Sequence, residues 1–151
     1  LMGIKGKKSV DSIHKELGHI MWEYVGMGRT EEGLKTALKL LKDIRKEFET
    51  NLFIPGSTEG VNIELEKALR LTDFITMGEL IAYDALNRNE SCGGHFREEY
   101  QTEEGEAKRD DENYFYVSCW EYQGSDDVAP VLYKEPLVYE AIKVQTRNYK
   151  S

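Results

Sequence analysis

The chain has 151 residues, of which 40% are hydrophobic and 32% are charged, and its formal net charge is −8 at pH 7. This length suffices for one domain with a hydrophobic core, and the acidic balance argues against a nucleic-acid partner, because phosphate binding needs clustered Lys and Arg. No run of about 18 apolar residues is present, so we expect no direct membrane span, and the two cysteines are typical of free thiols in a reducing compartment.

The first part of the chain carries the apolar pattern of a helix. Residues 1–8, rich in Gly and Lys, are expected to be a flexible lead-in. A first helix should begin after Ser9, which can cap its N-terminus, and Gly26 and Gly28 should end it. Its apolar positions recur every three or four residues, at Val10, Ile13, Leu17, Met21 and Tyr24.

A second helix should begin after Thr30, because this residue can cap it and two glutamates follow in the first turn. Its expected apolar face consists of Leu34, Ala37, Leu38, Leu41, Ile44 and Phe48. The short connection between the two helices predicts that they are antiparallel neighbours.

A third helix is predicted from Asn62, its expected N-cap, to about Asn89, after a loop at residues 50–61. The second half of this helix carries apolar residues on more than one side, namely Phe74, Ile75, Met77, Leu80, Ile81 and Tyr83. Such a helix is usually covered on several sides. We therefore expect the C-terminal tail, or another domain, to cover what two shorter helices cannot.

The last third of the chain changes to strand-like patterns. Tyr114–Tyr122 is rich in strand formers, and Val131–Ile142 resumes an extended pattern. A two-stranded ribbon is predicted, with Pro136 at an edge. The predicted fold class is mainly α: an antiparallel three-helix bundle at residues 9–90, followed by residues 91–151 as a loop and an extended tail with a β-ribbon, packed on the bundle.

The connection Asn87–Asp111 combines charged side chains of both signs with paired glycines, and composition alone favours a solvated helix end followed by an acidic loop. The same stretch, however, resembles a signature of the flavoprotein subunits of succinate dehydrogenase and fumarate reductase. In that family N-R-x-E-S-R-G-A-H-x-R-x-D is followed by R-D-D; here N-R-N-E-S-C-G-G-H-F-R is followed by R-D-D. Cys92 and Gly94 stand where Arg and Ala are usual, and Gln101–Lys108 looks like an insertion.

The resemblance covers nearly the whole chain. Met21–Leu34 resembles the first helical hairpin of the family's C-terminal domain, Asn62–Ser91 resembles its long helix, and Arg147–Tyr149 resembles its basic and aromatic end. In the family this domain is a spectrin-like three-helix bundle with an extended tail. The resemblance implies that the chain is the non-catalytic C-terminal domain of such a subunit.

The resemblance also implies a parent enzyme that interconverts succinate and fumarate, with FAD on an upstream Rossmann-type domain and with electrons exchanged with an iron–sulfur subunit. No catalytic, cofactor-binding or metal-binding residue is carried onto this chain, because the family's motifs for these roles lie upstream. The expected role is to support the FAD and capping domains of its own parent chain. The residues expected to serve that docking are Arg88, Glu90, Ser91, His95, Arg97, Arg109 and Asp110. The parent complex is expected to be cytoplasmic and peripheral, on the inner face of the cytoplasmic membrane.

Other interpretations of the same residues stay open at this point. Cys92 and His95 have the spacing of metal ligands, with Cys119 as a third, or of a thiolate–imidazole pair; a buried thiol and a hydrogen-bonded histidine are the simpler expectation. L-aspartate oxidase or a related FAD enzyme shares the E-S-x-G-x-H core, although R-D-D and the aromatic tail favour the first family. A stand-alone helical adaptor is the third alternative, and Leu1, which is not an initiator residue, leads us to expect a longer gene product instead.

Overall fold

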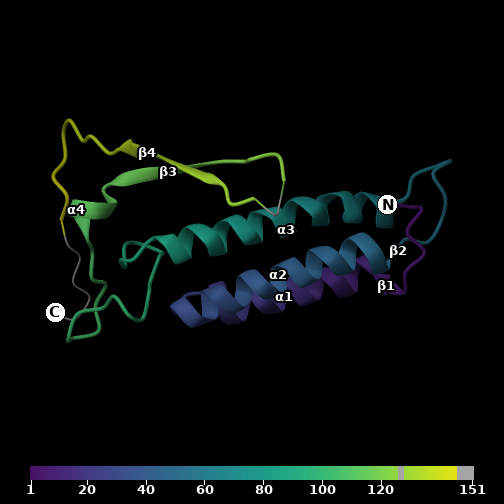
Figure 1. Cartoon of the computed structure of the whole chain (residues 1–151), viewed down its shortest axis with the longest axis horizontal. Coiled ribbons are helices and arrows are strands. Elements are labelled where there is room, and N and C mark those ends of the chain that lie inside the picture. Colours follow the sequence, from purple (N-terminus) through teal and green to yellow (C-terminus); the bar gives the residue numbers. More distant parts are fainter. Residues whose placement is uncertain (126–127, 146–151) are drawn as a thin grey trace.

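The computed structural model describes residues 1–125 and 128–145, and within them three long helices run side by side along the longest axis of the molecule (Figure 1). They are α1 (Val10–Val25), α2 (Glu31–Asn51) and α3 (Ile63–Asn87). A short helix α4 (Asp111–Tyr114) and two small two-stranded sheets complete the described part. The predicted mainly helical class is therefore confirmed.

Each long helix begins at a residue whose side chain accepts a hydrogen bond from the first turn. Ser9 Oγ accepts from the backbone N–H of Ser12 at 3.2 Å, and Thr30 Oγ1 accepts from that of Gly33 at 3.0 Å. Asn62 Oδ1 accepts from the backbone N–H of residue 65 at 3.0 Å. These bonds satisfy donors that have no partner inside a helix, and they confirm the three predicted N-caps.

Ion pairs between the helices establish their relative directions. Lys8, which precedes α1, pairs with Glu47 near the end of α2 at 3.5 Å, so α1 and α2 are antiparallel, as their short connection predicts. Asp11 in the first turn of α1 pairs with Lys67 in the second turn of α3 at 3.1 Å. Because both residues lie near the beginning of their helices, α1 and α3 run parallel.

The helices enclose one core of apolar side chains, made of Val10, Ile13, Leu17, Val25, Leu34, Ala37, Leu41, Ile44, Phe48, Leu52, Ile54, Ala68, Leu71, Ile75, Ala82 and Ala85. Small residues on α3 allow the other helices to approach it closely. A Cβ added at Gly78 would lie 3.1 Å from Sδ of Met21 and 3.5 Å from Cδ1 of Leu17. Side chains of α1 therefore pack directly onto the backbone of α3.

The N-terminal residues pair with the segment that follows α2. Strand β1 (Lys8–Ser9) pairs in parallel with β2 (Leu52–Phe53), which follows α2 directly. Gly6 N also donates to the carbonyl of residue 52 at 3.0 Å. An added Cβ at Gly6 would lie 1.9 Å from the backbone of Asn51, so this close approach requires glycine. The last three residues of the lead-in expected at residues 1–8 therefore hydrogen-bond to the end of α2 and to β2.

The C-terminal hairpin lies along the second half of α3 (Figure 1). It is made of β3 (Tyr116–Glu121) and β4 (Val131–Pro136), which are antiparallel, with Tyr116 opposite Pro136. The indole N–H of Trp120 donates to Asp84 Oδ1 at 2.8 Å, and the Trp120 ring meets that of Tyr83 edge-on. The hairpin thus covers part of the apolar surface of α3, and β4 ends at the proline, earlier than the predicted extended segment.

Two further expectations concern the C-terminal end of the chain and the crossing of a membrane. Residues 147–149, which resemble the basic and aromatic end of the family, lie outside the described residues. Within the described part of the chain, no helix is long and apolar enough to cross a membrane.

Candidate functional site

The candidate site is the connection from α3 to α4, residues 88–110, called the signature loop below. It lies at the end of the bundle where α3 ends, beside the turn between α1 and α2. Arg29 in that turn donates its backbone N–H to Phe96 O at 3.0 Å, and Glu98 N donates to Arg29 O at 2.8 Å. The signature loop is therefore joined by its backbone to a turn about 70 residues earlier in the chain.

A tight turn at Cys92–His95 shapes the first half of the signature loop. The backbone N–H of Cys92 donates to His95 O at 2.8 Å, and that of His95 donates to Cys92 O at 3.0 Å. Gly93 inside the turn has φ +59°, a conformation that side chains with a Cβ rarely adopt. The turn directs the His95 ring back toward the helices.

Arg97 is the most deeply buried charged side chain of the signature loop, with 1% of its surface exposed. Its Nη1 donates to Ala85 O at 3.1 Å and to Leu86 O at 3.4 Å, carbonyls in the last turn of α3. Its Nε donates to Glu99 Oε2 at 3.0 Å. Ser91 Oγ accepts from Arg97 N at 2.8 Å and donates to Arg97 O at 3.1 Å. A cation thus satisfies carbonyls at the negative end of the helix dipole.

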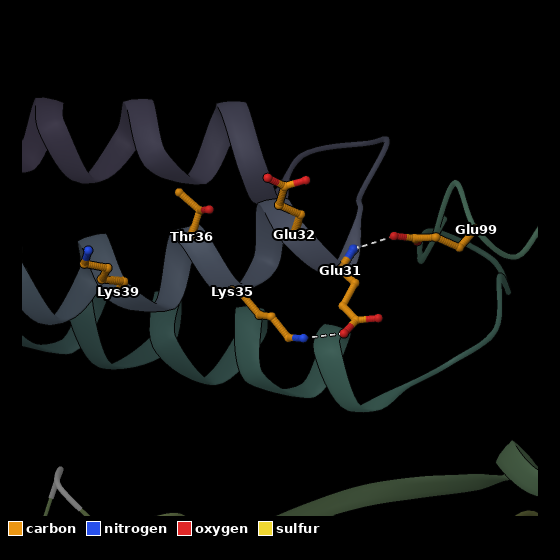
Figure 2. A pocket seen from close by; sticks show the side chains of 6 residues that line it. All are labelled: Glu31, Glu32, Lys35, Thr36, Lys39 and Glu99. Carbon is orange, nitrogen blue, oxygen red and sulfur yellow. Dashed lines mark hydrogen bonds and ion pairs between the residues drawn. The ribbon is translucent and has the colours of Figure 1, made fainter.

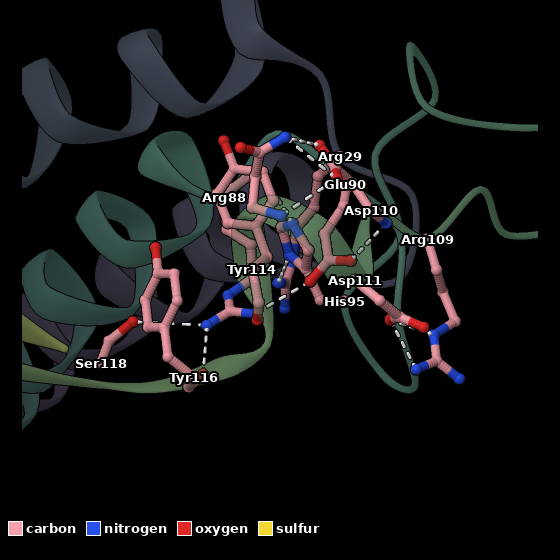
Figure 3. A network of polar contacts seen from close by, with 11 residues as sticks. Arg29, Arg88, Glu90, His95, Arg109, Asp110, Asp111, Tyr114, Tyr116 and Ser118 are labelled. Carbon is pink, nitrogen blue, oxygen red and sulfur yellow. Dashed lines mark hydrogen bonds and ion pairs between the residues drawn. The ribbon is translucent and has the colours of Figure 1, made fainter. Parts of the chain in front are cut away.

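Arg88 and Glu90 join the end of α3 to the start of the hairpin (Figure 3). Arg88 Nη1 pairs with Glu90 Oε1 at 2.9 Å, and Glu90 is 2% exposed. The other Glu90 oxygen accepts the backbone N–H of Asp110 at 2.9 Å. The Arg88 guanidinium also donates to Tyr114 O and Tyr116 O at 3.1 and 3.0 Å and lies against both tyrosine rings. The buried Glu90 carboxylate is thus paired and hydrogen-bonded at both oxygens, as a buried charge requires.

His95 uses both of its ring nitrogens inside the protein. Nδ1 lies 2.9 Å from Arg29 Nη1, and Nε2 lies 2.9 Å from Arg88 O. Because a guanidinium can only donate, Nδ1 is the acceptor, so Nε2 carries the hydrogen and donates to the carbonyl. Burial lowers the pKa of His95, and the charges of Arg29, Arg97 and Arg88 lower it further. Burial also lowers the pKa of Arg29, against the opposing effect of Asp84. The imidazole is therefore neutral at pH 7.

The network leaves no free imidazole nitrogen for the chemistry that the Cys92-x-x-His95 spacing suggested. A thiolate–imidazole pair needs a ring nitrogen facing the thiol, and both nitrogens of His95 face other groups. Cys92 and Cys119 are free cysteines. Among the residues that the structure describes, no cluster of three or more His, Cys, Asp or Glu side chains is arranged to hold a metal ion.

The R-D-D segment at the end of the signature loop is divided between two roles. Asp110 contributes its backbone N–H to Glu90 and caps α4 by accepting from Asn113 N at 3.2 Å. Arg109 lies apart from the central cluster (Figure 3) and pairs with Asp111 at 2.6 Å. Of the residues expected to dock, Arg88, Glu90, Ser91, His95 and Arg97 are therefore brought together, Asp110 joins them through its backbone, and Arg109 does not.

Two residues of this region were not predicted from the sequence. Arg29 supplies the hydrogen bond that determines the His95 tautomer, and its only sequence signal was its place in the resembled Met21–Leu34 segment. Asp84 accepts the indole N–H of Trp120 and so holds the hairpin on α3. Nothing in the local pattern around Asp84 distinguishes it from a solvated helical carboxylate.

A shallow surface depression of about 550 Å³ lies beside the N-terminal end of α2, lined by Glu31, Glu32, Lys35, Thr36, Lys39 and Glu99 (Figure 2). Its charged groups are partly occupied with one another. The backbone N–H of Glu31 donates to Glu99 Oε1 at 2.5 Å, and the Glu31 side chain pairs with Lys35. The depression is open and lined mainly by charged side chains, unlike the concave apolar sites that bind small organic molecules.

Residues 14–149 of the chain match the family described as "Fumarate reductase flavoprotein C-term". The fumarate reductase flavoprotein subunit of Helicobacter pylori is 29% identical over 137 residues, which are 91% of this chain and 18% of that protein. A chloroplastic L-aspartate oxidase of Nicotiana tabacum is 37% identical over 88 residues, which are 58% of this chain and 13% of that protein. The chain thus spans less than a fifth of the length of the curated relatives it matches.

A solved structure of a quinol-fumarate reductase with menaquinol molecules has the same fold over this region. The two superpose with a TM-score of 0.76, at 24% sequence identity, over 94% of this chain and 23% of that one. At this identity the likeness concerns the fold alone. The matching part includes the helices and extends into the region of the hairpin, because it leaves only a few per cent of this chain unmatched.

Proposed function

The chain belongs to the family of fumarate reductase flavoprotein C-terminal domains, and on that premise we propose that it is the non-catalytic end of a flavoprotein subunit that interconverts succinate and fumarate. The preceding part of that polypeptide would bind FAD and the dicarboxylate. The present domain would support the FAD and capping domains of the same chain. An iron–sulfur subunit would exchange electrons with the flavin.

One observation carries the structural role: the central charged groups of the signature loop are bonded to one another or to backbone groups. A general acid or base must have an atom within hydrogen-bonding reach of the substrate. His95 has both nitrogens bonded within the protein, and Arg97 and Glu90 are almost fully buried. The partners of His95 and Arg97 are side chains and backbone carbonyls of the chain itself, so this network supports a structural role.

In this proposal the signature residues serve docking from inside the domain. Arg97 holds the signature loop on the end of α3, His95 joins it to Arg29 in the α1–α2 turn, and Arg88 holds the start of the hairpin. These three contacts orient the surfaces that the domain presents to the rest of its polypeptide. In this proposal residues 9–90 form the spectrin-like bundle, and residues 91–151 form the loop and tail packed on it.

The location proposed for the parent complex follows from the same family. The parent flavoprotein would lie in the cytoplasm, peripheral to the inner face of the cytoplasmic membrane, and would reach the membrane through partner subunits. The support for this proposal is the family match over residues 14–149.

L-aspartate oxidase is the second candidate, because one such enzyme has the higher identity of the two relatives, 37% against 29%. The extent of the match favours the first proposal. An alignment of 137 residues within a chain of 151 must include the hairpin, whereas the aspartate oxidase alignment covers 88 residues. The two candidates differ in the substrate that their preceding domains oxidise or reduce.

The test is to purify the complete polypeptide that contains this domain and to measure its visible absorption spectrum and its turnover. We expect bound flavin, succinate oxidation with an artificial acceptor, and fumarate reduction with a reduced dye. The 151-residue chain alone, mixed with FAD, should show neither bound flavin nor turnover. Turnover with L-aspartate and none with succinate would favour the second candidate. Flavin bound stoichiometrically by the 151-residue chain would overturn the non-catalytic assignment.

A further inference from the structure

Large apolar side chains are exposed along the strip where α1 and α3 lie side by side. Trp22 on α1 is 84% exposed, and Phe74, Met77 and Ile81 on α3 are 46%, 52% and 40% exposed. These four residues are called the α1–α3 face below. Large apolar side chains gathered in one place are typical of a surface that another protein covers.

The four side chains fall on one strip because α1 and α3 run parallel. Phe74, Met77 and Ile81 follow one another at spacings of three and four residues, which places them on one side of α3. The ring of His14 stacks on that of Phe74 with 5.4 Å between centroids. Trp22 lies about two turns, or about 12 Å, beyond His14, which brings it level with Ile81.

The centre of the strip is open to an approaching surface. Gly18 lies on α1 one turn after His14 and one turn before Trp22, and an added Cβ there would meet nothing within 4 Å. A partner can therefore reach the backbone of α1 at this point. The side of α3 that packs on α1 has no such open space, since a Cβ at Gly78 would lie 3.1 Å from Met21.

The outer side of α2 has a different chemistry. It exposes Glu32, Lys35, Lys39, Lys42, Asp43, Lys46 and Glu49. Side chains of both charges at helical spacing are typical of a surface that stays in water. This contrast between the charged side of α2 and the apolar α1–α3 face indicates that another part of the protein covers the α1–α3 face.

We propose that the α1–α3 face docks on the preceding part of the same polypeptide. More than four fifths of each curated relative lies outside its match to this chain, and the matching family is the C-terminal part of the flavoprotein. Both α1 and α3 begin at the end of the molecule where residue 1 lies (Figure 1). A preceding segment therefore enters at the end where both helices begin, and the strip starts about 16 Å farther along α3, at Phe74. The inference depends on the proposed function only for the statement that the preceding part binds flavin.

The first experiment is hydroxyl-radical footprinting of the complete polypeptide and of the 151-residue chain, followed by peptide mass spectrometry. Labelling of Trp22, Phe74 and Met77 should fall by about fivefold or more in the complete polypeptide, because a docked surface excludes water. Leu69 is the internal reference, since it lies on α3 with 57% exposure but 80° or more around the helix from the strip. Its labelling should be similar in the two proteins.

The second experiment introduces charge on the strip in the complete polypeptide. Met77→Glu combined with Ile81→Glu should make the domain separable by limited proteolysis at protease concentrations that leave the parent protein intact. Leu69→Glu, on the same helix and at a position at least as exposed, is the matched control and should behave as the unchanged protein does. The far-ultraviolet circular dichroism of each variant in the 151-residue chain tests whether the helices still form.

The outcomes separate this inference from the proposed function. Equal labelling of Trp22 and Met77 in both proteins, or protection confined to Val117 and Tyr133 on the outer face of the hairpin, overturns the α1–α3 face as the docking surface. Protection that appears in the 151-residue chain alone and disappears on dilution would show that a second copy of the chain covers the α1–α3 face. That result also overturns the proposal. Flavin content and fumarate reduction, measured on the same samples, test the proposed function independently of the footprint.

Discussion

Arg29 Nη1 and His95 Nδ1 lie 2.9 Å apart although 66 residues separate them in the sequence. The contact joins the α1–α2 turn to the signature loop, and its direction is set by chemistry, since the guanidinium can only donate and the imidazole nitrogen must accept. A protonated imidazole cannot accept this bond. The charge state of one histidine is therefore coupled to the packing of two distant segments.

The first prediction is a pH dependence of stability that originates at His95. Its pKa in the folded chain lies below the ordinary value of 6.5, so below about pH 6.5 the unfolded chain binds a proton that the folded chain does not. The free energy of unfolding should fall as the pH is lowered from about 6.5 toward the folded pKa, and the contribution of His95 should be constant above that window. Urea titrations between about pH 5.5 and 8 measure it.

A histidine variant supplies the control for this pH dependence. His95→Gln removes the titrating group, so its unfolding free energy should lack the component that the unchanged chain loses below about pH 6.5. His19→Gln, at an exposed position of α1, should retain it. The same slope in all three proteins would contradict the assignment to His95.

The second prediction concerns Arg97. Arg97→Ala should lower the free energy of unfolding by about 3–5 kcal/mol, because two carbonyls at the end of α3 lose charge-assisted hydrogen bonds worth about 1.5–3 kcal/mol each. Arg70→Ala, a change of the same residue type at an exposed position of α3, should have an effect within about 0.5 kcal/mol. Chemical denaturation of the 151-residue chain measures both, and comparable losses would show that the signature loop is only a solvated helix end.

The third prediction is a loss of stability on truncating Ser91. Its hydroxyl accepts from Arg97 N and donates to Arg97 O, and the residue is fully buried. Ser91→Ala should cost about 1–3 kcal/mol, since a buried donor and a buried acceptor lose their partner together. Ser57→Ala, in the exposed loop before α3, is the comparison and should leave the thermal midpoint nearly unchanged. A midpoint for Ser91→Ala as high as that of Ser57→Ala would contradict the geometry.

The fourth prediction compares two glycines on neighbouring helices. Gly18→Ala should stabilise the chain by up to about 1 kcal/mol, because the added methyl group meets nothing within 4 Å and Ala is the better helix former. Gly78→Val should destabilise it by about 1–3 kcal/mol, because its side chain must displace Met21 and Leu17 from the packed interface. Thermal unfolding followed by circular dichroism distinguishes the two signs, and stabilisation by Gly78→Val would show that α1 and α3 pack less closely than described.

The predictable part of this protein consists of features whose causes lie within a few residues. Ser9, Thr30 and Asn62 each precede a helical apolar pattern, and each caps the helix that follows. Helix capping and helix periodicity are local, so a sequence contains the whole signal. The order of the signature residues, likewise local, was sufficient to identify the family, which the match over residues 14–149 now shows.

The tertiary structure alone decided how those local elements meet. The pairing of Lys8 with Leu52, the bond from Trp120 to Asp84 and the contact between Arg29 and His95 each join residues that are far apart in the chain. The sequence around each of these residues does not indicate which partner the residue meets. The chain by itself determined which helices form and where they begin, because capping and periodicity act over a few residues. Only the folded arrangement decided which charges are buried together, because that depends on which backbone groups and opposite charges packing brings within hydrogen-bonding distance.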